Sequence, residues 1–300
     1  MCLLLTNCSA RLAACGALAA ITSLAAPLMP AAEQAPPQCQ PAAALVRVPE
    51  LPEGSGLAAS RKTPGRFWSH NDSGNAVLFA LDGNGRVTGR LTLPGTKLED
   101  WEAVAVGSCP SGSCIYLADI GDNNARRRRI AIYRVAEPAE ASGTVQVSDV
   151  FYATYPDRAH DAEALLVTDD GRLHIVTKGD TGPVSLYRFP TELQSGTTMR
   201  LERVGGPRAP AGKDRITDGA VSPDGRWVVL RSEQQLMFYR TADLLSGNWR
   251  EAGRVALATL GEPQGEGVTF GSDNSLYLMS EGGGRRQPGR FARLTCTLSP

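Results

Sequence analysis

A short motif recurs five times along the chain, and this repeat restricts the fold more than any other feature of the sequence. Each copy is an acidic residue, then Gly or Ala, then a short apolar run. Four clear copies, and a weaker fifth with Ser in place of the acid, begin at Glu102, Glu163, Asp218, Glu266 and Ser55. Successive copies start 47, 61, 55 and 48 residues apart, which is the length of a four-stranded blade with variable loops. The sequence therefore predicts an all-β fold, a five-bladed β-propeller.

The segments between the copies have the pattern of three further strands per blade. Polar turns with Asp-Gly or Asn, which supply the positive φ of a tight hairpin, follow three of the copies at 169–171, 223–225 and 272–274. Second strands are predicted at 66–70, 115–119, 173–177, 227–231 and 276–280. Third strands are predicted at 77–81, 130–135, 184–189, 236–240 and 290–296, and fourth strands at 86–93, 145–155, 199–204 and 254–260. A sixth blade within the long interval 102–163 is the alternative.

The last blade has no fourth strand of its own, because the sequence ends soon after its third. The strand-like segment 45–48 precedes the first copy and has no other place. We expect it to complete the last blade and to close the ring, so that the propeller domain spans 44–300.

The first 32 residues differ in composition from the rest of the chain. They contain no acid and a single base, Arg11, which precedes an apolar stretch ending in small residues. This pattern predicts a signal peptide over 1–32, followed by a Pro- and Gln-rich linker over 33–43, and hence a secreted or periplasmic protein. An uncleaved membrane anchor and a lipoprotein attached at Cys15 are the alternatives.

Four cysteines follow the predicted signal peptide, and an even number in an exported chain indicates disulfide bonds. Cys109 and Cys114 flank a turn-forming Pro-Ser-Gly-Ser stretch, so we expect a local bridge there. Cys39 then pairs with Cys296 and ties the two ends of the propeller together. Four free thiols in a reducing compartment are the alternative.

The charge and the missing motifs exclude several functions. The chain has 31 basic and 31 acidic residues, so its net charge gives no reason to expect nucleic acid or an anionic membrane as a partner. It has no P-loop, no dinucleotide-binding glycine motif, no His-Glu-x-x-His and no Gly-x-Ser-x-Gly. We expect a monomer that has no membrane span once the signal peptide is removed.

The propeller geometry brings many acids to one rim of the central channel. In each blade the first strand starts at the face to which the second strand returns, so residues at these two points share a rim. Close carboxylates repel one another unless a cation neutralises them, and oxygen ligands suit Ca²⁺. The predicted calcium ligands are Glu102, Glu163, Asp218 and Glu266, with Asp119 and Asp122 nearby. The alternative is a salt-bridge network with Lys178, Arg231 and the arginines of 126–129.

Two histidines are candidates for proton transfer at the same rim. His70 with Asp72, and His160 next to Asp161, each place an imidazole beside a carboxylate. The predicted catalytic residues are therefore His70, Asp72 and His160, and a surface His beside an Asp without any catalytic role is the alternative. Other polar residues of the rim are predicted to bind a small-molecule ligand in the channel: Asn71, Asn123, Lys178, Arg231 and Glu281.

Several short segments resemble those of a family of uncharacterised exported bacterial propellers. They are 70–74 (HNDSG), 100–103 (DWEA), 119–123 (DIGDN), 161–165 (DAEAL), 177–178 (TK), 217–218 (TD) and 222–225 (SPDG). More distantly, the chain is similar to the regucalcin/gluconolactonase and phytase-like propellers. That resemblance implies a calcium-type ion in the central channel and hydrolysis of esters or lactones. Those relatives usually have six blades, against the five counted here.

Two functional hypotheses follow. The first is a cation-dependent hydrolase of a small ester, lactone or phosphoester, with the ion polarising the scissile bond or a bound water. The second is a non-catalytic propeller whose rim binds a ligand or a protein. The fold alone does not separate them, since propellers serve both purposes.

Overall fold

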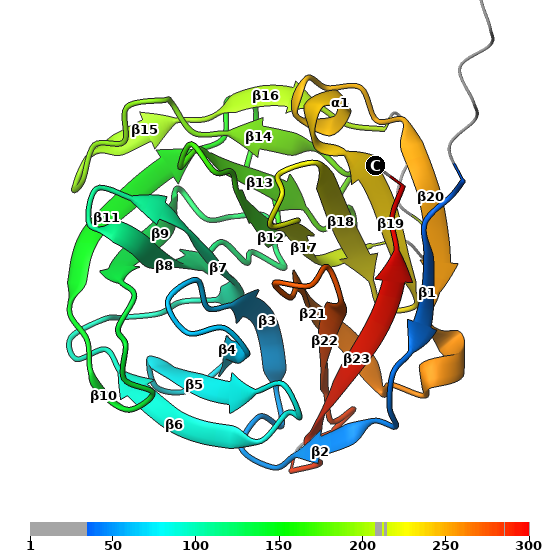
Figure 1. Cartoon of the computed structure of the whole chain (residues 1–300). Helices are drawn as coiled ribbons and strands as arrows, with labels where there is room; N and C mark the ends of the chain where they lie inside the picture. The colour runs from blue at the N-terminus through cyan, green and yellow to red at the C-terminus, as the bar shows by residue number, and fades with distance from the viewer. Residues whose placement is uncertain (1–34, 208–211, 213–214, 285, 300) are drawn as a thin grey trace, which may run out of the picture. The chain divides into compact units, whose positions relative to one another are not determined.

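The computed structural model describes residues 35–207, 212, 215–284 and 286–299. Their strands form five sheets, each of four or five strands, arranged as the blades of a five-bladed β-propeller (Figure 1). The predicted fold class and blade number are confirmed. The predicted signal peptide lies outside the described residues. Within them, no helix is long and apolar enough to cross a membrane.

Each blade has a first strand nearest the channel and three more toward the outside. Blade one contains β3 (Gly54–Ala59), β4 (Arg66–Asn71), β5 (Val77–Asp82) and β6 (Val87–Thr92). Blade two contains β7 (Trp101–Cys109), β8 (Gly112–Asp119), β9 (Ile130–Ala136) and β11 (Val147–Thr154). Blade three contains β12 (Ala162–Val167), β13 (Leu173–Thr177), β14 (Leu186–Arg188) and β16 (Glu202–Gly205). Blade four contains β17 (Ile216–Val221), β18 (Trp227–Ser232), β19 (Gln235–Arg240) and β20 (Glu251–Ala256). Blade five contains β21 (Gln264–Phe270), β22 (Leu276–Glu281) and β23 (Gly289–Thr297).

Two short strands connect neighbouring blades at their outer edges. β10 (Gly143–Thr144) pairs in parallel with β6 of blade one, and β15 (Thr198–Arg200) pairs in parallel with β11 of blade two. The predicted strand at 199–204 is therefore wrong in its first residues, which join the preceding blade. The predicted strand at 254–260 begins earlier, as β20, and residues Ala258–Leu260 form a 3₁₀ turn. The one α-helix of the described residues is α1 (Thr241–Leu245), between β19 and β20.

Chain segments from before the first blade complete blade five. β2 (Val46–Val48) pairs with β23, which confirms the predicted closure of the ring. β1 (Gln38–Pro41) extends the same edge, with Cys39 directly opposite Cys296. These four residues fall within the stretch 33–43 that the sequence predicts as a linker, and β23 is long enough to pair with both segments. Both predicted disulfides are present, Cys39–Cys296 and Cys109–Cys114.

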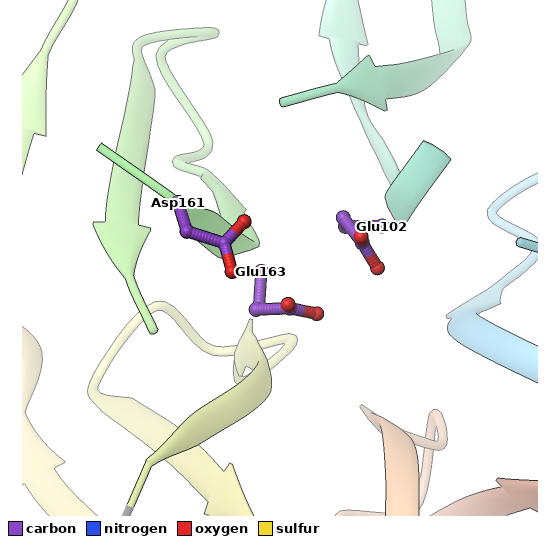
Figure 2. A group of neighbouring side chains, drawn as sticks. All are labelled: Glu102, Asp161 and Glu163. Carbon is purple, nitrogen blue, oxygen red and sulfur yellow. The ribbon is translucent and has the colours of Figure 1, made fainter. Parts of the chain in front are cut away.

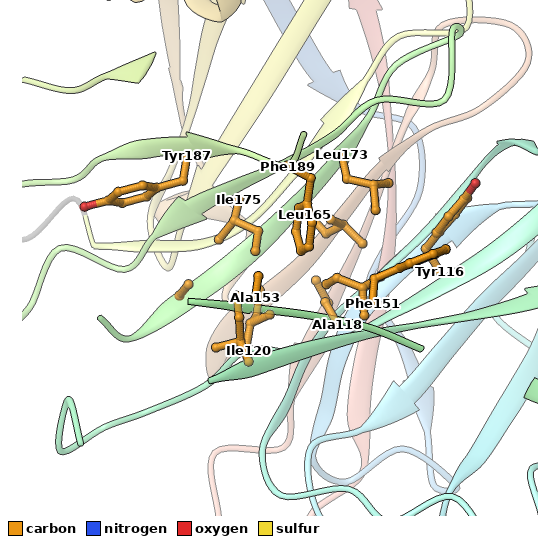
Figure 3. Packing of buried hydrophobic residues seen from close by; sticks show 14 of the residues in the cluster. Tyr116, Ala118, Ile120, Phe151, Ala153, Leu165, Leu173, Ile175, Tyr187 and Phe189 are labelled. Carbon is orange, nitrogen blue, oxygen red and sulfur yellow. The ribbon is translucent and has the colours of Figure 1, made fainter. Parts of the chain in front are cut away.

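The core lies between the blades. Figure 3 shows one such layer, in which apolar side chains of blade two, such as Ile120 and Phe151, pack against Leu165, Ile175 and Phe189 of blade three. All five are buried. Side chains on the two faces of each strand thus pack into opposite neighbouring layers. These layers fix the first strands around the channel and position the polar residues described next.

Candidate functional site

A β-bulge occurs at the start of every first strand and creates the ring of polar residues. The pairing with the second strand shifts register there in all five blades. A bulge places an extra residue in one strand and redirects its side chain. The residues at this position, called the bulge ring below, are Ser55, Glu102, Glu163, Thr217 and Glu266.

The two hydroxyl residues of the bulge ring tie blades together. Ser55 Oγ donates a hydrogen bond to the Glu102 main-chain oxygen at 2.9 Å, and Thr217 Oγ1 donates one to the Glu266 main-chain oxygen at 3.1 Å. Each bond joins one blade to the next. Thr217, and not the predicted Asp218, therefore occupies the ring position of blade four.

Asp218 has a structural role. It is 1% exposed, and its Oδ2 accepts a hydrogen bond from the Val268 backbone amide at 2.8 Å. The backbone amides of Gly219 and Leu57 also donate to this carboxylate. Burial raises the pKa of Asp218, and these three amides act in the opposite direction. Asp218 thus accepts hydrogen bonds from backbone amides of three first strands. It does not belong to the group of acids that could share a metal ion.

Three buried carboxylates converge on one side of the channel. Glu102, Asp161 and Glu163, called the acidic cluster below, offer oxygens that all lie within 4.8 Å of one another. In Figure 2, Asp161 and Glu163 project from one blade and Glu102 faces them from the next. Lys178 is their counterion, with its Nζ 2.5 Å from Glu163 Oε1 and 3.7 Å from Asp161 Oδ2. Three carboxylates and one ammonium leave two formal negative charges.

A glycine makes room for this arrangement. A Cβ at Gly121 would collide with Glu102 Oε1 and with the carboxylate of Asp100. Asp100 precedes Glu102 by two residues, and burial together with the charge of Asp161 raises its pKa. The acidic cluster therefore has a fourth carboxylate close by.

Burial and mutual repulsion shift the pKa values of the carboxylates in the cluster. Burial and the adjacent Glu163 raise the pKa of Glu102 well above its usual value. Burial raises the pKa of Glu163 to about 7, against the effect of Lys178. A hydrogen bond between the two side chains raises the pKa of Glu102 and lowers the pKa of Glu163, the pattern expected when a shared proton lies on Glu102. Burial disfavours the ammonium form of Lys178, but Glu163 and Asp161 raise its pKa above the usual value.

More acids with raised pKa values surround the channel mouth. Burial and Glu163 raise the pKa of Glu266 to about 8, and Glu266 Oε1 accepts a hydrogen bond from Gln264. Burial and neighbouring acids raise the pKa of Glu281 to about 7 and that of Asp72 to about 6. This side of the mouth therefore takes up protons near neutral pH.

Asp119 and Asp122 hold loops together and do not belong to the acidic cluster. Asp119 accepts hydrogen bonds from the backbone amides of Glu99 and Asp100 and pairs with Arg127 at 2.7 Å. Asp122 Oδ2 accepts a bond from the Arg127 amide at 2.7 Å. Both oxygens of Asp119 and one oxygen of Asp122 are thus engaged, and neither residue belongs to the group of carboxylates close enough to share an ion.

Neither rim histidine reaches the channel as a free base. His70 is fully buried, its Nδ1 lies 3.1 Å from the Asn71 oxygen, and burial lowers its pKa to about 4. His160 is 6% exposed, and its Nε2 contacts Asp157 and the Tyr187 hydroxyl. Asp161 is next to His160 but does not bond to it. The predicted proton-transfer role of the two histidines has no support in this geometry.

Two of the predicted ligand-binding residues have structural contacts instead. Arg231 is fully buried, and it donates to the Gly267 and Met279 oxygens and pairs with Glu262 at 2.6 Å. The Asn71 amide bonds to the backbone of the 50–53 turn.

The other three face the rim. Lys178 and Glu281 are partly exposed, and Asn123 is exposed. They remain candidates for ligand contact.

Sequence reasoning missed Asp161, although a signal for it exists. Asp100-Trp101-Glu102-Ala103 and Asp161-Ala162-Glu163-Ala164 share the pattern Asp-x-Glu-Ala, and residues two apart in a strand lie on the same face. We had paired Asp161 with the neighbouring His160 instead.

The donor set fits a hard divalent cation. Carboxylate oxygens are the ligands that Ca²⁺ and Mg²⁺ prefer, and once the shared proton is displaced the three carboxylates carry two more negative charges than the Lys178 ammonium neutralises. Asp161 Oδ2 is buried and has no hydrogen-bond partner among the described residues, so it has a lone pair to offer. A cation would also replace the proton that Glu102 and Glu163 share.

Comparison with known proteins supports the fold. No family model and no curated protein matches the chain. Among solved structures, it is similar to the PQQ-bound aldose sugar dehydrogenase of Streptomyces coelicolor, with 13% identity, a TM-score of 0.54, and coverage of 88% of this chain and 100% of that one.

A gluconolactonase and a regucalcin are also among the similar solved structures. A gluconolactonase from Xanthomonas campestris has 12% identity, a TM-score of 0.43, and coverage of 89% and 99%. A calcium-binding regucalcin from Agrobacterium tumefaciens has 12% identity, a TM-score of 0.45, and coverage of 85% and 96%. The similarity to the dehydrogenase, the one of these three with a TM-score above 0.5, shows the fold alone.

Proposed function

We propose that this protein is an exported propeller that binds a divalent cation at the acidic cluster and hydrolyses a small ester, lactone or phosphoester there. The observation that carries the proposal is the convergence of Glu102, Asp161 and Glu163, three buried carboxylates with one ammonium for all of them. Uncompensated buried charge destabilises a fold, so its presence at one point favours a functional reason.

The residues of the cluster have distinct roles in this proposal. Glu102, Asp161 and Glu163 would hold the cation, which would supply a Lewis acid beside the channel. Lys178, which pairs with Glu163 in the structure, would then be available to an anionic group of the substrate. Glu266 and Glu281, with pKa values of about 8 and about 7, can each hold or give up a proton near neutral pH, the task that we had assigned to the histidines.

Calorimetric titration with Ca²⁺, Mg²⁺ and Mn²⁺ tests the cation site directly. We expect one ion per chain, an affinity that rises from pH 6 to pH 8 because binding releases the shared proton, and loss of binding in Glu102→Gln. Glu202→Gln is the matched control, since Glu202 is an exposed acid paired with Arg188 on an outer strand. Equal binding by Glu102→Gln and the control would exclude the cluster as the site.

Hydrolysis is then measured with a panel of lactones, carboxylic esters and phosphomonoesters, with cation and with chelator. A turnover that requires both the cation and Glu102 supports the enzyme proposal. Cation binding without any turnover supports the second candidate, a propeller that binds a ligand without catalysis. The ion pair between Lys178 and Glu163, which neutralises part of the cluster without any ion, is the observation on which this second candidate rests.

A further inference from the structure

We propose that a pocket beside the acidic cluster binds a phosphoryl or similar tetrahedral oxyanion group. The pocket lies between the β8–β9 loop of blade two and the connection from β11 to β12. Both segments are on the face where the first strands begin. We further infer that it anchors the anionic end of the molecule that reaches the channel, a step that rests on the proposed function.

Four arginines line this pocket, which we call the arginine pocket. Its volume is about 160 Å³, whereas a single buried water needs only about 10–15 Å³, so an oxyanion has room. The arginines are Arg127, Arg128, Arg129 and Arg158, and Asp122 is the one carboxylate among the lining residues.

Hydrogen-bond donors outnumber acceptors in the pocket. The Tyr155 hydroxyl and Arg127 Nε are both buried and have no partner among the described residues. Arg128 is exposed and has no hydrogen bond or ion pair in the described part of the chain, and Arg129 only stacks on Tyr152. Asp122 Oδ2 already accepts a bond from the Arg127 amide. Buried donors are nearly always satisfied in folded proteins, so the surplus points to an acceptor-rich ligand.

Charge identifies the class of that ligand. Arginine presents a fork of donors that suits phosphate and carboxylate oxygens. Arg127 is neutralised by Asp119 and Glu99, but Arg128 and Arg129 have no carboxylate partner in the described residues. A group with several oxygens and a double negative charge can satisfy both guanidinium groups and the tyrosine hydroxyl together.

The arginine pocket and the acidic cluster are neighbours. The Asp122 backbone amide donates to Asp161 Oδ1 at 2.6 Å, so a lining residue of one site touches a member of the other. A single small molecule can therefore place an oxyanion among the arginines and its remainder over the carboxylates. Among esters, lactones and phosphoesters, this arrangement selects substrates that carry an oxyanion group.

The experiment is a titration of inorganic phosphate into the purified protein with chelator present, followed by ³¹P NMR or calorimetry. Arg128→Gln should weaken binding by about ten-fold, the typical effect of removing one charge-assisted hydrogen bond. Tyr155→Phe, which removes a hydroxyl without changing the ring, should also weaken it. Arg126→Gln is the matched control, because Arg126 belongs to the same run of arginines but does not line the pocket.

The outcomes separate this inference from the proposed function. Glu102→Gln should lose cation binding and keep phosphate binding in chelator. Absence of phosphate binding by the unaltered protein, or equal weakening by Arg126→Gln and Arg128→Gln, would overturn the oxyanion pocket and leave the cation site intact. Since Arg128 is exposed, its replacement should leave the thermal midpoint unchanged, so a loss of binding cannot be attributed to unfolding.

Discussion

Replacement of Lys178 by methionine removes the counterion that the described residues supply to the acidic cluster and keeps most of the side-chain volume. Loss of one partner from a buried ion pair costs about 3–5 kcal/mol. The Lys178 side chain is 23% exposed, while that of Glu163 is 2% exposed, so solvent screens the pair in part and we take about 3 kcal/mol. At about 2 °C per kcal/mol for a domain of this size, the melting temperature should fall by about 6 °C.

The loss should depend on pH in a defined direction. Burial raises the pKa of Glu163 from 4.5 to about 7, and removal of Lys178 raises it further. A carboxyl with a raised pKa in the folded state contributes stability that is present below 4.5 and is lost as pH rises through the folded value. The variant should therefore unfold more easily than the unaltered protein at pH 8, and the difference should shrink toward pH 5.

Urea unfolding at pH 5 and pH 8, with chelator, measures this difference, and Lys97→Met on the exposed surface is the control. Addition of Ca²⁺ at pH 8 should restore the Lys178 variant more than the unaltered protein, because the ion takes the place of the ammonium. If Lys178→Met and Lys97→Met unfold alike at pH 8, the ammonium does not hold the carboxylates together. If the variant is destabilised but calcium has no effect, the acids form a structural network and the cation site is refuted.

Three further results are expected from the structure. Glu266→Gln should flatten the decline in stability between pH 5 and pH 9 in urea unfolding, because the pKa of Glu266 is raised by burial and Glu163 to about 8; an unchanged profile would place that titration elsewhere. Cys39→Ser with Cys296→Ser should lower the melting temperature by about 10 °C, since the bridge closes a loop with a sequence separation of 257 residues and such closure is worth about 5 kcal/mol; a shift under a few degrees would mean that β1 and β2 close the ring unaided. Gly56→Ala should destabilise by about 1–3 kcal/mol in urea, because its Cβ would lie 2.5 Å from a backbone nitrogen of blade two, whereas Gly83→Ala, whose Cβ would meet only the Tyr277 hydroxyl at an ordinary contact distance of 3.8 Å, should be neutral.

The fold was largely predictable because the blade repeats its pattern. Asp-Gly turns and alternating apolar residues located the second strands to within a residue or two of their ends in four blades. The misplaced strand β15 (Thr198–Arg200) has no such signal, since it pairs in parallel with a strand 45 or so residues earlier and that pairing is visible only in three dimensions. The β1 segment, rich in Pro and Gln, has a weak strand pattern and depends on its partner β23.

The site was only partly predictable, and the bulges explain why. A bulge adds one residue to a strand, so it shifts which side chain faces the channel. In blade four, Asp218-Gly219 imitates the Glu-Gly of blade five, but the structure aligns Thr217 with the acids. His70 packs against Trp101 of the next blade, and His160 contacts Asp157 and the Tyr187 hydroxyl. These contacts join residues about 30 apart in the sequence or only three apart across a turn, and the spacing of residues along a strand does not predict them.

The bulge ring contains two kinds of residue, hydroxyl residues that the fold explains and glutamates that it does not. Ser55 and Thr217 show that a small hydroxyl residue suits this position, since each bonds to the carbonyl of the next blade. Glu102, Glu163 and Glu266 occupy the same position, and burial raises the pKa of all three, so their ionised forms destabilise the folded protein near neutral pH. Residues that break a local rule without a structural gain are expected at functional sites. Two of these three glutamates form the acidic cluster with Asp161, and the Asp122 amide of the arginine pocket donates a hydrogen bond to Asp161. The buried negative charge of the cluster and the unpaired hydrogen-bond donors of the pocket therefore lie next to each other.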